Sequence, residues 1–472
     1  MNITVQDLLD VPFVNEDGVK ALGQAHTFRG VSTDSRTLKQ GDIFFALKGP
    51  NFDGHKYIAD VAREGALAAV VNDIWYAAQK SKRFPLPVFV VKDTLFALGQ
   101  LAKIYRKKFK IPLVVIAGSN GKTTTKELIA HVLSSTRSVL KTEGNHNNQI
   151  GVPHTLFQLR DGHDLAVLEI GTNHPGEIAW LCDIAEPTHA LITNVGREHL
   201  EFFKDLKGVA AEERAAFDYV AERRGMAFIN MDDKFLKSAV KQFGDRGITY
   251  GSGEQPDGRF IHAYKVGYAK DGRTELRVGC EGKSFRVRTY LVADYAPNAI
   301  AAAVAVGLHF QMRRAEIKDQ IETFHPHGKR LEVIHLDGLT FLNDCYNANP
   351  DSMESSLRTL TEFPATGRKF AVLGDMFELG EETIKEHRAL GRKIAQQGFD
   401  HVLFTGKAME AAWKAYNSAS GKTNGSTKNS YFKNNSELAA SLRDQLQPGD
   451  AILVKGSRGM KMEEVIDLLS RG

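Results

Sequence analysis

The residues of this chain that are best suited to chemistry follow a short apolar run, Leu-Val-Val-Ile-Ala at residues 113–117. A glycine-bearing turn that ends in Gly121-Lys122-Thr123 comes next, and apolar residues at helical spacing follow it. In such a turn backbone N–H groups converge on an anion, Lys122 can neutralise phosphate charge, and the Thr123 hydroxyl can bind Mg²⁺. The pattern predicts a nucleotide phosphate site made by Gly118, Ser119, Asn120, Gly121, Lys122, Thr123 and Thr124.

A second Gly-Lys-Thr, at residues 421–423, indicates how little the tripeptide means alone. No apolar strand precedes it, and residues 417–430 are mainly Ser, Asn, Gly, Lys and Thr. This composition is typical of a surface loop. The prediction of a phosphate site at residues 121–123 therefore depends on the apolar strand that precedes them. The usual motif has an outer glycine, and Ala117 or Ile116 stands at that position here.

Length and composition indicate a soluble protein of several domains. At roughly 100–200 residues per domain, a chain of 472 residues holds about three. A hydrophobic fraction of 42% with 25% charged residues is ordinary for a globular protein. The net charge of +4 is spread along the chain, so we expect the basic run at residues 105–110 to close a solvent-exposed helix and not to bind nucleic acid.

The chain also lacks signals for disulfides, zinc and membranes. Its three cysteines are far apart, which indicates neither a disulfide framework nor a zinc site. The sequence opens without a basic and apolar leader, and no apolar segment approaches about eighteen residues. We therefore expect a cytoplasmic protein that does not insert into membranes, and we expect a monomer.

The order of apolar runs and glycine turns predicts an α/β protein of three domains. Residues 1–92 form a small N-terminal α/β domain, because short apolar strands alternate there with turns and helical stretches. Residues 93–324 form a central P-loop ATPase domain with a mostly parallel sheet, and residues 250–292 alternate like a β-rich appendage to it. Residues 325–472 alternate strands and helices, which predicts a C-terminal Rossmann-like domain.

Two side chains near predicted strand ends could assist at the phosphate site. Glu169 stands at the end of an apolar strand, and His199 follows another. Ligand-binding groups collect at the carboxyl ends of parallel strands, and Mg²⁺ bound to phosphates favours one or two carboxylates, so Glu169 is a candidate metal ligand. A single histidine is more often structural, and spacing alone leaves the role of His199 open.

Several longer blocks resemble the Mur ligases. The phosphate loop, residues 142–153, residues 169–171 and the pattern Thr193-Asn-Val-Gly-x-x-His199 together resemble the central ATPase domain of that family. Blocks at residues 344–353, 373–380 and 455–463 resemble the C-terminal domain of one branch, and blocks at 31–36, 41–47 and 52–55 match its N-terminal domain. The resemblance covers all three domains in the same order.

The resemblance implies an ATP-dependent acid–amino-acid ligase in cytoplasmic peptidoglycan precursor synthesis. That branch uses ATP and Mg²⁺ to join D-alanyl-D-alanine to UDP-N-acetylmuramoyl-tripeptide through an acyl phosphate. Residues 1–92 would bind the UDP-muramyl substrate, residues 93–324 would bind ATP, and residues 325–472 would form the ligase domain. Whether the tripeptide ends in diaminopimelate or lysine stays open.

The same resemblance implies roles for individual residues. Lys122, Glu169 and His199 would be catalytic, and Thr123, Glu169 and His199 would serve the metals. The UDP end of the substrate would face Thr33, Asp34, Ser35, Arg36 and Lys48, and the remaining substrate contacts would come from Asn145, Asn147, Asn148 and Asn349. Further contacts to ATP would come from Asn298, Arg330, Asp344 and Asn347.

The chain departs from the family pattern at two positions. The family carries a lysine, modified to a carbamate, that ligates a second Mg²⁺, and Glu213 stands there if no gap is allowed. Three interpretations stay open: Glu213 supplies the carboxylate directly, water fills the metal site, or catalysis is impaired. Tyr295 replaces the first Asn of a block near the adenine, while Asn298 is retained, and a stacked tyrosine could still hold the base.

Two rival functions also stay open. A related ligase with another amino acceptor is disfavoured by the blocks at residues 346–350 and 34–36. A nucleotide-binding scaffold without turnover is suggested by Glu213 and Tyr295. The three catalytic candidates disfavour the scaffold, because a protein that has lost turnover has no need of all three.

Overall fold

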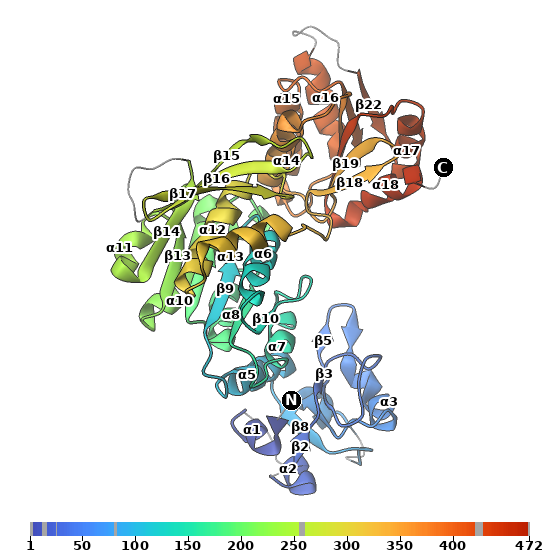
Figure 1. The fold of residues 1–472 in the computed structure, drawn as a ribbon. Helices are drawn as coiled ribbons and strands as arrows, with labels where there is room; N and C mark the ends of the chain where they lie inside the picture. The colour runs from blue at the N-terminus through green and yellow to red at the C-terminus, as the bar shows by residue number, and fades with distance from the viewer. Residues whose placement is uncertain are drawn as a thin grey trace.

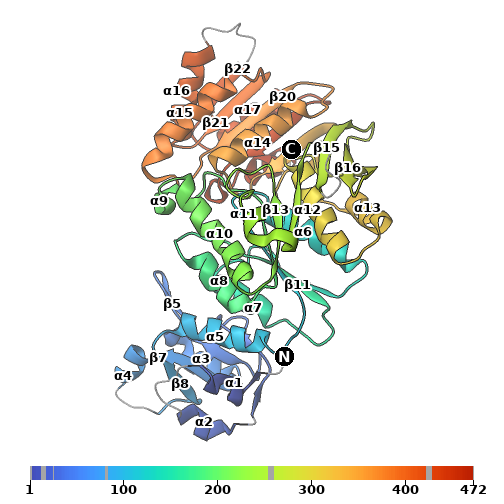
Figure 2. The same cartoon turned by 90° about the vertical axis from the view of Figure 1, so that its left-hand side faces the viewer.

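The computed structural model describes residues 3–11, 17–24, 26–79, 83–253, 260–420 and 428–470. The second Gly-Lys-Thr, at residues 421–423, lies outside them. Three α/β bodies follow one another along the molecule, with the N-terminal and C-terminal bodies at opposite ends and the central body between them (Figure 1). The view from the side keeps this order (Figure 2).

The N-terminal body is built on a parallel sheet of four short strands in the order β3-β4-β7-β8. Its strands are β3 (Val31–Ser32), β4 (Ile43–Phe45), β7 (Ala68–Asn72) and β8 (Val88–Val91). Two antiparallel pairs accompany it, β1 (Ile3–Thr4) with β2 (Thr27–Phe28) and β5 (Lys48–Gly49) with β6 (Phe52–Asp53). Its helices are α1 (Val5–Leu9), α2 (Asp17–Leu22), η1 (Gly54–Tyr57), α3 (Ile58–Arg63) and α4 (Asp73–Ala77).

The central body holds a nine-stranded sheet in the order β10-β11-β9-β12-β13-β14-β15-β16-β17. The strands are β9 (Leu113–Ala117), β10 (Val139–Lys141), β11 (Leu165–Glu169), β12 (His189–Ile192), β13 (Met226–Asn230), β14 (Gly247–Ser252), β15 (Ile261–Tyr268), β16 (Thr274–Cys280) and β17 (Lys283–Thr289). Pairing is parallel from β10 to β15 and antiparallel from β15 to β17. The segment predicted as a β-rich appendage is therefore a continuation of the main sheet.

Helices cover both faces of this sheet, as a parallel sheet requires. One face carries α5 (Thr94–Arg106), α7 (Gly151–Leu156), α8 (Glu177–Ala185) and α10 (Leu206–Glu222), and the other carries α6 (Lys122–Ser134), α12 (Ala296–His309) and α13 (Arg314–Thr323). The shorter helices are α9 (Leu200–Phe203), α11 (Ala239–Phe243) and η2 (Gly244–Arg246). Within β9, Val115 packs into the first core and Val114 and Ile116 pack into the second. This strand is thus fixed from both sides, and so is the turn at its end.

The C-terminal body contains a six-stranded sheet in the order β18-β19-β23-β20-β21-β22. Its strands are β18 (Glu332–Leu336), β19 (Leu339–Asp344), β20 (Lys369–Gly374), β21 (His401–Thr405), β22 (Lys428–Phe432) and β23 (Ala451–Lys455). Only β18 pairs antiparallel among them, so the sheet is mixed. Its helices are α14 (Pro350–Glu362), η3 (Gly380–Glu382), α15 (Thr383–Ile394), α16 (Met409–Ser420), α17 (Asn435–Arg443), η4 (Arg458–Met460) and α18 (Glu463–Ser470).

The basic run at residues 105–110 closes a helix as predicted, with Lys107, Lys108 and Lys110 exposed, but its first two residues differ from the prediction. Helix α5 does end at Arg106, but Tyr105 and Arg106 are both buried. The Arg106 guanidinium donates to the carbonyls of Ala185 at 3.1 Å and Ile111 at 2.9 Å. Its charge therefore ties α5 to the end of α8, which sequence spacing could not indicate because Ala185 lies far along the chain.

Candidate active site

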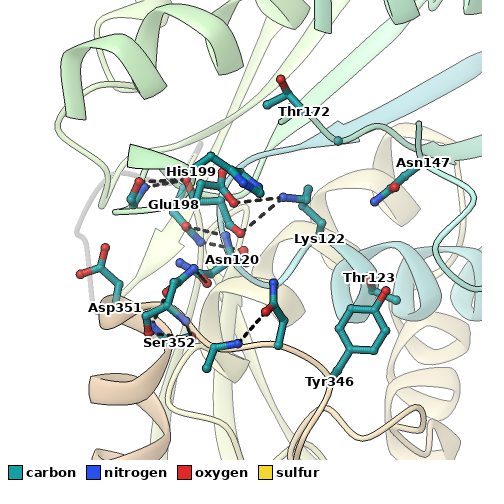
Figure 3. Close-up of a pocket in the computed structure, with 18 of the residues that line it drawn as sticks. Asn120, Lys122, Thr123, Asn147, Thr172, Glu198, His199, Tyr346, Asp351 and Ser352 are labelled. Carbon is teal, nitrogen blue, oxygen red and sulfur yellow. Dashed lines mark hydrogen bonds and ion pairs between the residues drawn. The ribbon is translucent and has the colours of Figure 1, made fainter. Parts of the chain in front are cut away.

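The turn between β9 and α6 has the backbone shape that phosphate binding needs. Gly118 and Gly121 have φ angles of 110° and 78°, which glycine adopts at little cost. Gly121 is the N-cap of α6 and makes no side-chain cap, so the first N–H groups of the helix are open to an anion. Lys122 begins the helix, and its ammonium donates to the Gly118 carbonyl and lies 3.6 Å from Glu198 Oε2 (Figure 3).

The electrostatic surroundings keep Lys122 charged. Burial alone would lower the pKa of its ammonium, but the nearby acidic side chains of Glu198, Glu213 and Glu169 together outweigh burial and the net pKa is raised. A lysine held charged at a helix N-terminus is suited to neutralising phosphate oxygens.

Near the turn between β9 and α6 (residues 118–121, called the phosphate turn below), the buried oxygens Thr123 Oγ1 and Glu169 Oε2 are among those without a hydrogen-bond partner in the described part of the chain. Glu169 ends β11, which pairs with β9, and its other oxygen accepts from Asn147 Nδ2 at 2.8 Å. Among the described residues, no three His, Cys, Asp or Glu side chains are grouped so that they could hold a metal by themselves. Because Mg²⁺ is usually bound by one or two carboxylates together with phosphates and water, the two free oxygens fit this ion.

The loop after β12 is fastened to the phosphate turn. Asn120 N–H donates to Asn194 Oδ1 at 3.1 Å, and Asn194 Nδ2 donates back to the Asn120 carbonyl at 2.9 Å. His199 lies at the end of this loop with a φ of 47°. Its Nδ1 lies 2.9 Å from Glu378 Oε2 of the C-terminal body. His199 therefore stands where the central and C-terminal bodies meet.

A cavity of about 830 Å³ lies between these two bodies. The central body contributes, among the predicted site residues, Ser119, Asn120, Gly121, Lys122, Thr123, Thr124, Asn145, Asn147, Asn148, Glu169, His199 and Asn298. The C-terminal body contributes Arg330, Asp344, Asn347 and Asn349. Blocks that are far apart in the sequence are therefore brought to one cavity.

The residues from the C-terminal body are held by their own network. Asp344 Oδ2 accepts from Lys455 Nζ at 2.5 Å and from Ser356 Oγ at 2.6 Å. The Arg330 guanidinium lies over the ring of Tyr346 at 3.7 Å. These contacts fix the side chains before any ligand arrives, which limits the entropy lost on binding.

The predicted UDP-facing residues lie apart from this cavity, in the N-terminal body. Asp34 forms an exposed ion pair with Arg36 at 2.6 Å, and this contact lowers the pKa of Asp34 to about 2. Thr33 Oγ1 lies 2.9 Å from Nε2 of His154 on α7 of the central body. Ser35 and Lys48 lie on the same body, and the cavity lining includes neither of them. The structure therefore separates the predicted sugar-nucleotide residues from the predicted phosphate residues.

Comparison with known proteins covers most of the chain. Residues 116–306 match the Mur ligase middle domain, residues 329–458 the Mur ligase, glutamate ligase domain, and residues 27–106 the Mur ligase family, catalytic domain. The UDP-N-acetylmuramoyl-tripeptide--D-alanyl-D-alanine ligase of Escherichia coli (strain K12) is 35% identical over 447 residues, which are 94% of each chain. The chain belongs to the Mur ligase family. The ligase of the same name from Bacillus subtilis (strain 168) is 34% identical over 442 residues, covering 93% of this chain and 92% of the relative.

Solved Mur ligase structures share the whole architecture. MurF from Acinetobacter baumannii has a TM-score of 0.85 at 28% identity, with 100% of this chain and 99% of that chain covered. The MurF ligase from Thermotoga maritima in complex with ADP has a TM-score of 0.80 at 27% identity, covering 94% and 97%. The three-domain α/β fold with a mostly parallel central sheet is thus confirmed. No helix in the described part of the chain is long and apolar enough to cross a membrane.

Glu213, which departs from the Mur ligase pattern, lies behind the phosphate turn. It is fully buried on α10, and its Oε2 accepts from the Gly118 N–H at 2.6 Å. Burial raises the pKa of Glu213 to about 8, Lys122 opposes this shift and Glu198 adds to it. Its Oε1 has no hydrogen-bond partner among the residues that the structure describes. The residue contacts the turn directly, and its role as a metal ligand stays a prediction.

Tyr295, the second departure, lies beside the start of α6. Its hydroxyl is 3.3 Å from Thr124 Oγ1, and it lines the cavity together with Asn298. Burial raises the pKa of Tyr295 to about 12, so the phenol stays protonated at neutral pH. Asn298 Oδ1 is buried and has no hydrogen-bond partner within the described ranges of the chain. An amide oxygen in this state is available to the exocyclic amine of a base, which suits the predicted adenine contact.

Among the residues at the site that were not predicted as site residues are Glu198, Glu378 and Lys455. Glu198 lies next to His199 at a predicted strand end, and that position was a usable signal. Lys455 stands at the end of β23 and opens one of the blocks that resemble the family. Glu378 lies in the block at residues 373–380 that resembles the family, which was also a usable signal, but its contact with His199 forms only where the two bodies meet.

Proposed function

We propose that this chain is an ATP-dependent ligase that joins D-alanyl-D-alanine to UDP-N-acetylmuramoyl-tripeptide in cytoplasmic peptidoglycan precursor synthesis. The observation that carries the proposal is the cavity in which the phosphate turn, Glu169 and His199 face Asp344 and Asn349 across two bodies. The relatives of that name match this chain over more than nine-tenths of its length. We expect the chain to act as a monomer.

The proposal assigns one ligand to each body. Residues 1–92 bind the UDP-muramyl substrate, residues 93–324 bind ATP, and residues 325–472 bring the dipeptide. The reaction needs all three ligands, because a peptide carboxylate is a poor acylating group. ATP converts it to an acyl phosphate, which the amine of the dipeptide then attacks.

The residues of the chain supply position and charge. Lys122 and the N–H groups at the start of α6 hold the terminal phosphates of ATP, and transfer of a phosphoryl group depends chiefly on such positioning and charge neutralisation. Thr123 and Glu169 would hold Mg²⁺, with His199 and Glu213 as candidates for a second ion. When bound, Mg²⁺ neutralises charge on the phosphates.

The C-terminal body supports the second half of the reaction. Asp344 and Asn347 lie beside Lys455, and we assign them with Arg330 to ATP. Asn349, which donates to Asn120 Oδ1 at 2.9 Å, is assigned to the dipeptide side. A cavity enclosed by two bodies also limits water, which would otherwise hydrolyse an acyl phosphate.

Phosphate release with ATP, Mg²⁺ and UDP-N-acetylmuramoyl-tripeptide tests the proposal, with and without D-alanyl-D-alanine and with product mass as a second readout. Each form of the tripeptide, ending in diaminopimelate or lysine, is assayed. We expect the UDP-muramyl-pentapeptide to form in step with phosphate. ATP binding without phosphate release or pentapeptide, with either tripeptide, contradicts the proposal and supports the scaffold.

A further inference from the structure

Arg197 joins the loop after β12 to two helices of the C-terminal body. Its Nε and Nη2 donate to Asp351 Oδ1 at 2.9 and 2.6 Å, and its backbone N–H donates to Asp351 Oδ2 at 2.5 Å. Nη2 also donates to Glu354 Oε1 at 2.7 Å, and Nη1 donates to Glu386 Oε2 at 3.0 Å. One guanidinium therefore contacts three carboxylates, two on α14 and one on α15. We call this set of four residues the Arg197 clamp.

The charges of the clamp favour the arrangement in which the central and C-terminal bodies are in contact. Its three carboxylates all belong to the C-terminal body, and like charges brought together there repel one another. Lys393 offsets part of this repulsion through Glu354, at 2.5 Å. The rest is offset by Arg197 from the central body, whose side chain is only 24% exposed and therefore less screened than a surface charge.

The neighbours of Arg197 in the chain contact the phosphate turn. Gly196 N–H donates to Ser119 Oγ at 2.7 Å, and Glu198 Oε2 lies 3.6 Å from Lys122 Nζ. Figure 3 shows Glu198 and Lys122 on one side of the pocket and Asp351 nearby on the segment from the C-terminal body. A displacement of Arg197 would therefore also move the loop that borders the phosphate turn.

The first turn of α14 contacts the same site. Asn349 caps α14 by accepting from the Ser352 N–H at 2.8 Å, and its Nδ2 donates to Asn120 Oδ1 at 2.9 Å. Asp351, in the same turn, is the main partner of Arg197. The start of α14 is therefore attached to the central body at two points, the phosphate turn and the loop after β12.

We infer that Arg197 is a positioning residue, which holds the start of α14 against the phosphate turn and so aligns the dipeptide side of the site with the ATP side. The inference rests on the proposed function. Arg197 itself does not line the cavity. It acts through Asp351, Glu354 and Glu386, and its removal changes alignment without removing a phosphate ligand.

The test compares Arg197→Met and Arg197→Lys with the control Glu362→Gln. The control breaks the pair between Lys265 Nζ and Glu362 Oε2, 2.7 Å long, which also joins the two bodies but at the far end of α14. The readouts are kcat and KM, the Kd of ADP by calorimetry, and the radius of gyration by X-ray scattering. Circular dichroism and thermal unfolding identify any variant that does not fold.

We expect Arg197→Met to lower kcat by about 30-fold, because misplacement of reacting groups by about 1 Å costs up to about 100-fold. The Kd of ADP stays within about two-fold and the radius of gyration increases, since the phosphate turn is intact and the bodies are less firmly attached. Arg197→Lys keeps the charge but loses the two-pronged contact with Asp351, so it restores part of kcat. Glu362→Gln stays near wild type in kcat.

A double-variant cycle with Glu386→Gln tests whether the loss of kcat in Arg197→Met comes from the broken clamp. If Arg197 acts through Glu386, the double variant loses no more than Arg197→Met alone. The inference is overturned by an unchanged kcat and radius in Arg197→Met, by an equal loss in Glu362→Gln, or by losses that multiply in the cycle. A wild-type protein that forms no product overturns the proposed function instead, and the scattering comparison still decides whether Arg197 holds the two bodies together.

Discussion

At the scale of single residues, Lys122 is the side chain on which the site depends most directly. Its ammonium lies 3.6 Å from Glu198 Oε2, and the residue begins the helix that we propose to bind phosphate. We expect Lys122→Met to reduce kcat by about 100- to 1000-fold, the loss that follows removal of one charge-stabilising donor. Phosphate release in the presence of all substrates measures this effect.

Lys422 provides a matched control for Lys122. It stands in the second Gly-Lys-Thr, which no apolar strand precedes. The variant Lys422→Met should keep the wild-type rate. An equal loss in both variants would contradict the assignment of the first copy as the phosphate site.

A partly buried histidine pair outside the cavity makes stability depend on pH. His189 Nε2 lies 2.9 Å from His309 Nε2, and burial, with His309 adding to it, lowers the pKa of His189 to about 4. The folded protein therefore binds fewer protons than the unfolded chain between about pH 4 and 6.5, and this stabilisation is lost as the pH falls through that window. The loss between pH 7 and 5 is about 2 kcal/mol for this site.

Denaturant unfolding at pH 7 and 5 tests the histidine pair. In His189→Gln the free energy of unfolding should fall by about 2 kcal/mol less than in wild type over this interval, because the titrating group is gone. His335→Gln, at an exposed position on β18, serves as the control and should keep the wild-type pH dependence. If the free energy of unfolding of His189→Gln depended on pH as in wild type, other groups would be responsible for the loss of stability at acidic pH.

At the scale of elements, the junction of β9 and α6 depends on the backbone of Gly118. A Cβ there would lie 2.3 Å from Thr193 Oγ1 and 2.8 Å from its backbone N, and the φ of 110° disfavours any other residue. We expect Gly118→Ala to cost about 3 kcal/mol or more in stability and to weaken ADP binding at least about ten-fold. Thermal unfolding and calorimetry measure the two effects.

Gly144 is a control that separates the steric effect of an added Cβ on stability from the effect of a positive φ. Its φ is 56°, yet a Cβ there meets nothing within 4 Å. Gly144→Ala should therefore cost only about 1 kcal/mol. Comparable losses in the two variants would mean that the contact with Thr193 is unimportant.

The elements also show what sequence reasoning could and could not reach. The strand, turn and helix at residues 113–134 and the strand-end position of Glu169 were predictable, because these elements follow one another locally, whereas their binding of phosphate and metal stays a prediction. The antiparallel end of the central sheet was predictable only in part. The alternation of apolar and polar residues indicated strands, but the pairing of β15 with β14, which joins these strands to the main sheet, depends on tertiary packing. Arg197 and its partners are about 150 or more residues apart, so only the packed structure could bring them together.

At the scale of the whole molecule, the contact between the N-terminal and central bodies involves a predicted substrate residue. Thr33 Oγ1 and His154 Nε2 are 2.9 Å apart, and burial lowers the pKa of His154, which keeps its ring neutral near pH 7. Thr33→Val removes a hydrogen bond of about 1 kcal/mol. We expect KM for UDP-N-acetylmuramoyl-tripeptide to rise about three- to ten-fold while kcat and the Kd of ADP stay near wild type, and Thr33→Ser to retain the wild-type KM.

The same contact distinguishes two ways in which Thr33 could act. If Thr33 acts by orienting the N-terminal body through His154, then His154→Ala raises KM by the same factor and the double variant Thr33→Val/His154→Ala adds nothing further. If Thr33 instead touches the UDP end itself, the two effects multiply, because each variant then removes a separate interaction. Steady-state kinetics of the wild type, the two single variants and the double variant distinguish a Thr33 that orients the N-terminal body from a Thr33 that binds the substrate. An unchanged KM in Thr33→Val excludes both roles.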